Sequence, residues 1–151
     1  MRYLIGVGNY TAGDDAVGLR VVERIAEAGL ELGFRAIDLS SDSLNLVAYL
    51  TPETEAILVV DSAKMGLLPG AVRFFSPAEV ESSKSSPGLS THEGDLLNVL
   101  ALATAMGYPV PRFRFMGIEP ATLEPGAPLS PALESRTTEY VTAAIDALMA
   151  M

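Results

Sequence analysis

The sequence of 151 residues contains no cysteine and a single histidine. Without cysteine there is no disulfide, no thiolate metal ligand and no cysteine nucleophile, and we expect a cytoplasmic protein. No apolar run reaches the ~18–20 residues that a helix needs to cross a bilayer, so we expect no membrane insertion. The short apolar stretch of MRYLIGVGNY leads directly into a Gly-rich turn, which predicts a first strand and not a signal peptide.

Positive charge is also scarce, because 10 Lys and Arg residues stand against 19 Asp and Glu residues and the formal net charge is −9. Binding to nucleic acid needs clusters of Lys and Arg against the phosphates, so we expect no nucleic-acid partner. The acidity agrees with a basic peptide partner or a bound cation, and equally with a charge that only maintains solubility. The composition, 49% hydrophobic, predicts one globular domain over 1–151 and leaves the oligomeric state open.

The hydrophobic pattern alternates between strand-like and helix-like segments. Short apolar runs predict strands over 2–8, 34–39, 56–60, 71–75 and 113–118. Helical spacing predicts helices over 14–28, 43–50, 91–106 and from 131 onward, with Asp14, Ser90 and Ser130 as N-terminal caps. A Ser-rich loop is expected over 82–90 and an extended loop over 120–131. This order predicts an α/β fold, a single-domain three-layer sandwich around a mainly parallel twisted sheet.

Residues that can carry chemistry are expected at one edge of that sheet. The turn after the first strand leads to Asp15, Asp61 follows the central strand, and His92 begins a helix. Ligand sites in open α/β sheets lie at the carboxyl ends of the strands, so these three side chains are expected to converge. Two carboxylates and an imidazole suit zinc, nickel or manganese, and three ligands leave a position open for water or substrate.

Each of the three residues also has a simpler explanation. Asp15 at a helix start favours the helix dipole, an acid such as Asp61 after a strand is typical of a turn, and a lone histidine such as His92 is typical of a surface. Taken one at a time, the three residues therefore indicate little, and the prediction of a site depends on their joint position.

Two other kinds of site fit the sequence less well. The turn Gly6-Val7-Gly8 lacks a third glycine at the spacing of a dinucleotide site, and acidic residues occupy the helix start where a phosphate would lie. A Ser–His–Asp triad that uses Ser62 or Ser90 is geometrically possible, but the sequence contains no nucleophile-elbow motif.

Four blocks of the sequence, in this order, are similar to the nickel–iron hydrogenase maturation endopeptidases: GVGNYTAGDDAVGLRVVE, ILVVDSAKMGLLPGAVRFF, LSTHEGDLLNVL and MGIEPATLEPGAPLSP. They resemble the family's Gly-x-Gly-Asn turn with its acidic pair, its strand-ending Asp, its His and its Gly-Ile-Glu-Pro segment. The stretch MGLLPG over 65–70 most resembles enzymes that serve hydrogen-evolving, formate-linked hydrogenases. Residues 38–42 lack the family's Gly-rich turn, in a region tied to the choice of hydrogenase.

The resemblance implies an endopeptidase that removes the C-terminal extension of a hydrogenase large-subunit precursor after nickel insertion. Asp15, Asp61 and His92 would be its metal ligands and its catalytic residues, with nickel carried by the substrate and no organic cofactor. We expect metal-assisted hydrolysis, in which Asp14 or Glu119 could accept a proton. The alternative is a non-catalytic nickel checkpoint or assembly chaperone that binds the same precursor without cutting it.

Overall fold

The computed structural model describes residues 1–82 and 91–151. The Ser-rich loop predicted over 82–90 lies, beyond Ser82, outside the described residues, and so does the predicted cap Ser90. Within the described part of the chain, no helix is both long and apolar enough to span a bilayer.

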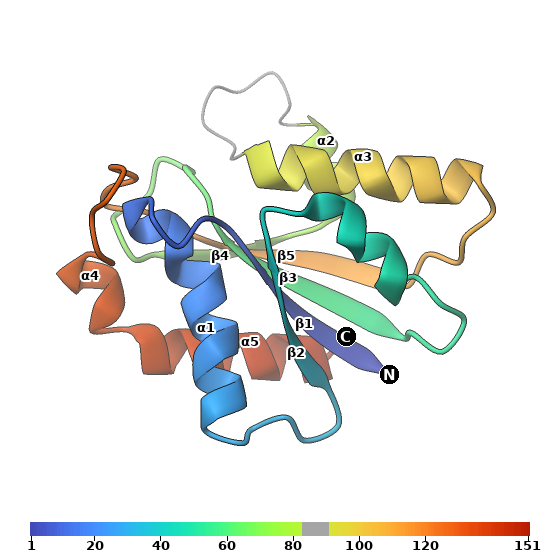
Figure 1. Cartoon of the computed structure of the whole chain (residues 1–151), viewed down its shortest axis with the longest axis horizontal. Coiled ribbons are helices and arrows are strands. Elements are labelled where there is room, and N and C mark those ends of the chain that lie inside the picture. The colour runs from blue at the N-terminus through green and yellow to red at the C-terminus, as the bar shows by residue number, and fades with distance from the viewer. Residues whose placement is uncertain (83–90) are drawn as a thin grey trace.

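Five strands form one mixed sheet in the order β2-β1-β3-β5-β4 (Figure 1). The strands are β1 (Arg2–Val7), β2 (Arg35–Ser40), β3 (Ala56–Ser62), β4 (Val72–Phe75) and β5 (Arg112–Ile118). All neighbours pair in parallel except β4, which runs antiparallel to β5 at one edge. The predicted strands are therefore confirmed, with β3 in the centre.

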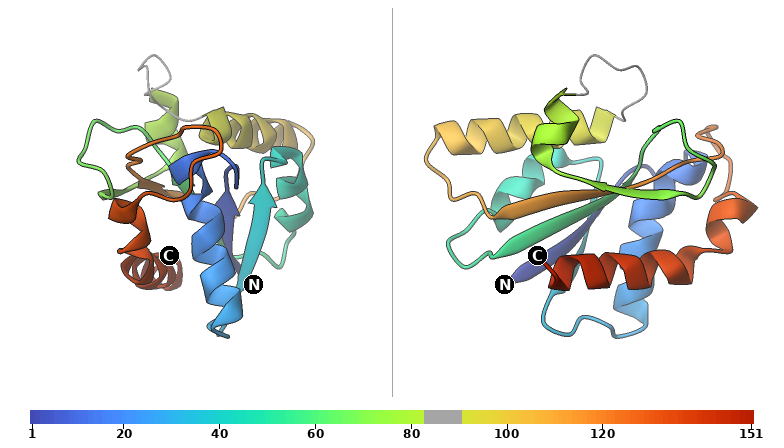
Figure 2. Two further views of the ribbon diagram at one scale, coloured as in Figure 1. Left: turned by 60° about the vertical axis from the view of Figure 1, so that its left-hand side comes forward. Right: turned by 180° about the vertical axis from the view of Figure 1, so that it is seen from behind.

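Helices cover both faces of the sheet, so the predicted three-layer α/β sandwich is confirmed (Figures 1 and 2). On one face lie α1 (Val17–Glu27) and α5 (Thr137–Met149). On the other face lie α3 (Thr91–Ala105), α2 (Pro77–Ser82) and the 3-10 helix η2 (Ser43–Tyr49).

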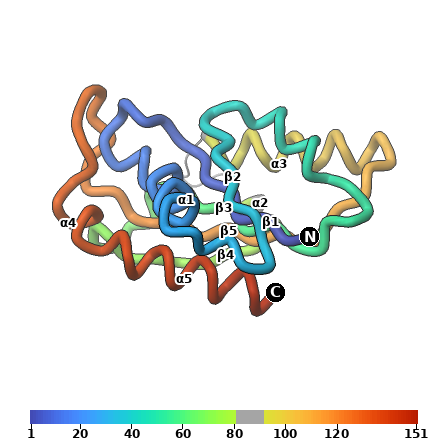
Figure 3. Tube along the Cα trace, turned by 60° about the horizontal axis from the view of Figure 1, so that its bottom comes forward, coloured from blue at the N-terminus to red at the C-terminus, as the bar shows by residue number. Residues whose placement is uncertain are grey.

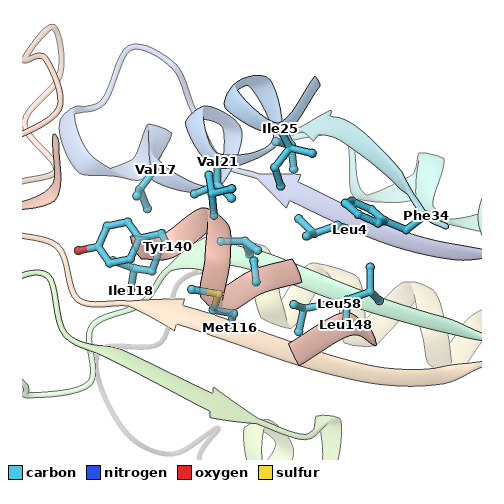
Figure 4. Packing of buried hydrophobic residues seen from close by; sticks show 14 of the residues in the cluster. Leu4, Val17, Val21, Ile25, Phe34, Leu58, Met116, Ile118, Tyr140 and Leu148 are labelled. Carbon is cyan, nitrogen blue, oxygen red and sulfur yellow. The ribbon is translucent and has the colours of Figure 1, made fainter. Parts of the chain in front are cut away.

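The central strand β3 supplies side chains to both halves of the core, because successive residues of a strand point to opposite faces. All seven of its residues are buried. Leu58 (Figure 4) and Val60 belong to the cluster under α1 and α5, whereas Ile57 and Val59 belong to the cluster under α3. This explains why β3 reads as a continuous apolar run, as is typical of strands covered on both faces.

Two glycines let α1 approach the sheet at backbone distance. A Cβ atom at Gly18 would lie 2.1 Å from the carbonyl oxygen of Val60, and one at Gly6 would lie 2.4 Å from the carbonyl oxygen of Gly18. Any side chain at either position would push the helix away from β1 and β3. Gly6 and Gly18 therefore allow the start of α1 to pack directly against the carboxyl end of the sheet.

The structure corrects the prediction of one helix over 14–28. A 3-10 turn, η1 (Gly13–Ala16), comes first, and α1 begins at Val17. Asp14 caps neither element, since neither has a side-chain hydrogen bond at its N-cap. The end of the helix is as predicted, because Gly29 follows it with φ of 67°, a left-handed conformation that glycine adopts without strain.

The predicted C-terminal helix is also divided. A short helix α4 (Pro131–Glu134) precedes α5, and Ser135 and Arg136 separate them. Ser130 stands at the N-cap position of α4 with Pro131 next to it, as predicted, but its hydroxyl makes no capping hydrogen bond.

The amino ends of the central strands lie far from the predicted site. The two chain termini lie side by side in Figure 3, and Arg2 Nη1 donates to the carbonyl oxygens of Leu148 and Met151 at 2.7 and 3.0 Å. This contact ties the C-terminal residues to the end of the sheet at which β1 begins. The opposite, carboxyl end of the strands carries the polar residues described next.

Candidate functional site

The three predicted residues meet at the carboxyl end of the sheet. One ligand atom each from Asp15, Asp61 and His92 can be chosen so that all lie within 4.8 Å of one another. Within this cluster, His92 Nε2 and Asp15 Oδ2 are 3.2 Å apart. The juxtaposition predicted from the sequence is therefore present.

Each of the three side chains comes from a different layer of the fold. Asp61 lies within β3 and is 1% exposed, and alternation with Val59 places it on the α3 face of the sheet. His92 lies in the first turn of α3, which crosses that face. Asp15 lies in η1, between β1 and α1. The three residues come together because the helices of both outer layers begin at this end of the sheet.

The backbone around Asp15 depends on Gly8. Its φ is 143°, and a Cβ atom there would lie 2.0 Å from the carbonyl oxygen of Asp15. That same oxygen accepts a hydrogen bond from the backbone N–H of Asn9 at 3.3 Å. Gly8 therefore leaves room for the turn that contains Asp15. This packing explains the glycine at position 8 without a bound phosphate.

Ser62 is a neighbour of the site whose role the sequence did not reveal. Its hydroxyl donates to Asp15 Oδ1 at 2.8 Å, while Asp15 Oδ2 faces His92. The carboxylate thus lies between the hydroxyl and the imidazole. In a Ser–His–Asp triad the imidazole occupies the middle position, so this arrangement does not support Ser62 as a nucleophile. The other serine considered, Ser90, lies outside the described residues.

The pair formed by Asp15 and His92 is electrostatically matched. Burial disfavours the charged form of Asp15, but the hydrogen bonds from His92 and Ser62 outweigh burial and hold the pKa of Asp15 below its ordinary value. The hydrogen bond with Asp15 raises the pKa of His92 above its ordinary value, against the opposing effect of burial. The pair therefore favours a carboxylate next to an imidazolium, and a cation bound by the imidazole would replace its proton.

Asp14 has a different role from its neighbour. It is 0% exposed, and its Oδ1 accepts the backbone N–H of Ser130 at 2.7 Å. Its Oδ2 accepts the hydroxyl of Ser130 at 2.8 Å and the backbone N–H groups of Ala121 and Thr122 at 2.8 and 3.2 Å. Asp14 therefore ties the loop over 120–130 to the turn before α1. The Ser130 hydroxyl, which was predicted to cap a helix, donates its hydrogen bond to Asp14 instead.

Glu119 likewise supports the backbone. It is 7% exposed, and its Oε1 accepts the backbone N–H groups of Met65 and Leu67 at 2.7 and 3.0 Å. Gly70 N–H donates to the Glu119 carbonyl oxygen at 2.8 Å. Glu119 thereby shapes the loop between β3 and β4. The contacts of Glu119 and of Asp14 argue against either as the proton acceptor considered from the sequence.

The donor set of Asp15, Asp61 and His92 fits a divalent cation. Two carboxylate oxygens and an imidazole nitrogen suit zinc, nickel or manganese, and a fourth position stays open. Ligand atoms around such a cation stand roughly 3–4 Å apart, because each is roughly 2.0–2.2 Å from the metal. The observed separations of 3.2 Å and within 4.8 Å thus need only small adjustments.

Comparison with known proteins places the chain among proteins of one kind. The family model described as hydrogenase maturation protease matches residues 19–147. The hydrogenase expression/formation protein HupD of Rhodobacter capsulatus is 31% identical over 149 residues, which cover 97% of this chain and 70% of that protein. HupM of Azotobacter chroococcum mcd 1 is 29% identical over 122 residues, 80% of this chain and 58% of that protein. The chain thus spans only part of the length of these relatives.

A solved structure has the same fold over nearly all of both chains. The [NiFe] hydrogenase maturation protease HybD from Thermococcus kodakarensis superposes with a TM-score of 0.79 and 25% sequence identity, covering 98% of this chain and 99% of that chain. This match agrees with the three-layer architecture of the chain.

Proposed function

The chain belongs to the hydrogenase maturation protease family, and from this premise we propose that it cuts the C-terminal extension from a nickel–iron hydrogenase large-subunit precursor after nickel insertion. Membership confirms the kind of protein predicted from the sequence. The observation that supports the specific proposal is the cluster of Asp15, Asp61 and His92, in which three ligand atoms lie within 4.8 Å of one another.

We propose that this trio binds the nickel that the precursor carries, so that the metal belongs to the substrate. Such a cation polarises the scissile carbonyl group or lowers the pKa of a bound water. His92 supplies a ring nitrogen, while Asp15 and Asp61 supply carboxylate oxygens that offset the charge of the cation. The Asp15–His92 hydrogen bond holds the two side chains close together before the substrate arrives.

Three finer predictions accompany this proposal. Service to a formate-linked, hydrogen-evolving hydrogenase rests on the MGLLPG stretch over 65–70, and relatives named HupD and HupM do not specify that branch. A cytoplasmic location rests on the absence of cysteine. The precursor as partner rests on the family. Each is tested separately, the first by the set of precursors that the protein cuts.

The decisive experiment incubates the purified protein with a nickel-loaded large-subunit precursor and measures the precursor's intact mass. The wild-type protein is expected to shorten the precursor at its C-terminus, whereas His92→Ala and Asp61→Asn are expected to leave it at full length. Asp146→Asn, an exposed acid on α5, is the matched control and should cut normally. Full processing by His92→Ala would refute the role of the trio, and binding without a change of mass would favour the chaperone alternative.

A further inference from the structure

Ser62 is the buried polar residue that links the central strand to Asp15. It is the last residue of β3, is 1% exposed, and pairs with Ile118 at the end of β5. Asp61 precedes it, and alternation along the strand sends the two side chains to opposite faces of the sheet. Asp61 therefore extends toward α3 and His92, while Ser62 extends toward the layer of α1, where η1 delivers Asp15.

The two oxygens of the Asp15 carboxylate are thus held from the two sides of the sheet. Ser62 Oγ donates to Oδ1 at 2.8 Å, and Oδ2 lies 3.2 Å from His92 Nε2. The hydroxyl belongs to a strand that is buried along its whole length, so the donor is fixed by the core of the fold. Its hydrogen bond restricts rotation of the carboxylate and directs Oδ2 into the cluster with Asp61 and His92.

We propose that Ser62 is a positioning residue of the nickel-binding trio, which orients Asp15 so that Oδ2 faces the cation. This inference rests on the proposed function, because it assumes that the trio binds the precursor's nickel. Groups that hydrogen-bond to metal ligands fix the orientation of those ligands, and their loss typically lowers metal affinity by about 10–100-fold. Ser62 itself contributes no ligand, so its effect has to act through Asp15.

The test measures the affinity of the purified full chain for Ni²⁺ alone by isothermal titration calorimetry. Ser62→Ala is expected to weaken binding by at least about 10-fold. Ser62→Thr retains the hydroxyl and is expected to restore affinity. Thr54→Val is the matched control, since it deletes another buried hydroxyl, one that donates to the Tyr49 carbonyl oxygen at 2.6 Å near the opposite end of β3. It should leave Ni²⁺ affinity unchanged.

A double-mutant cycle separates positioning from a general effect on structure. In the Asp15→Ala background, Ser62→Ala is expected to cause no further loss of Ni²⁺ affinity, because the side chain through which it acts is gone. Circular dichroism and thermal unfolding of each variant establish that the fold is retained. A loss of affinity that occurs equally in Thr54→Val, or that follows from unfolding of Ser62→Ala, would overturn the proposal.

The same titrations distinguish two kinds of failure. If the wild-type protein binds Ni²⁺, His92→Ala weakens binding, and Ser62→Ala does not, the positioning role is wrong and the proposed function stands. If the wild-type protein does not bind Ni²⁺, or if His92→Ala binds as tightly as wild type, then both the trio as a nickel site and the role of Ser62 are wrong.

Discussion

The acidic pair of Asp14 and Asp15 should separate stability from function, although the two residues are neighbours. Asp14→Asn changes one atom of a side chain that is 0% exposed and accepts four hydrogen bonds. All four partners donate, so both oxygens of Asp14 have to accept. An asparagine amide has one oxygen and one NH₂ group, and the latter can only donate.

The cost of this substitution follows from its best orientation. With the amide oxygen at the Oδ2 position, the contacts with Ala121, Thr122 and the Ser130 hydroxyl persist, and the NH₂ group faces the Ser130 N–H. A buried N–H left without an acceptor costs about 1–3 kcal/mol, and each of the other bonds weakens because its acceptor is now neutral. We expect a total loss of about 3–5 kcal/mol.

Asp15→Asn should behave differently. Its side chain is 14% exposed, and the amide oxygen can still accept the hydrogen bond from Ser62. We expect a loss of only about 1 kcal/mol of stability, together with weaker Ni²⁺ binding and loss of precursor cleavage. The same unit change of charge therefore has opposite consequences at adjacent positions.

Urea-induced unfolding followed by circular dichroism measures both variants, since the free energy of unfolding falls linearly with urea concentration. A loss of about 3–5 kcal/mol is a large part of the ~5–15 kcal/mol typical of a domain, so the midpoint of Asp14→Asn should shift clearly. The reasoning is refuted if Asp14→Asn loses less than about 1 kcal/mol, or if Asp15→Asn is destabilised equally.

Three further predictions concern other contacts. Gly18→Ala should lose at least about 3 kcal/mol of stability by urea unfolding, because the new Cβ would lie 2.1 Å from a β3 carbonyl oxygen. Gly94→Ala is the control and should be neutral or stabilising, because nothing lies within 4 Å of its Cβ. Equal effects of the two substitutions would contradict this reasoning. Glu119→Gln keeps the oxygen that accepts two backbone N–H groups and should retain both cleavage and stability, while Glu119→Ala should lose about 2–4 kcal/mol of stability. If Glu119→Gln instead keeps its stability but loses cleavage, Glu119 takes part in catalysis. The lowered pKa of Asp15 gives a stabilising contribution that is present above about pH 4 and is lost as pH falls through that lowered pKa. The raised pKa of His92 gives a contribution that is present below about pH 6.5 and is lost as pH rises through that raised pKa. The stability lost in His92→Gln should therefore be greatest between about pH 4 and pH 6.5 and shrink as pH rises through the raised pKa of His92; urea unfolding across pH checks this, and a difference that grows at high pH would contradict it.

Much of the fold could be predicted because its signals are local. The apolar run of β3 and the helical spacing of α1 and α3 record which faces are buried, and burial is the main determinant of these elements. The boundaries at η1 were missed because Asp14 is an ordinary helix-capping residue by sequence. Its real partners begin 107 positions further along the chain, and no local pattern reveals them.

The sequence by itself determined the α/β order, the family and the set of acids and histidine that could share a cation. It did so because strand and helix periodicity, and the spacing of Gly6, Gly8 and Gly18, are patterns within short stretches of the sequence. The close approach of α1 to Val60 gives those glycines their physical reason.

Only the tertiary structure decided which acid does what. Asp14 and Asp15 are adjacent, but successive residues of a helical turn point in different directions, so one meets Ser130 and the other meets Ser62 and His92. Those partners lie 116, 47 and 77 positions away in the chain. The folding of distant segments onto one end of the sheet therefore separates a structural carboxylate from a candidate ligand.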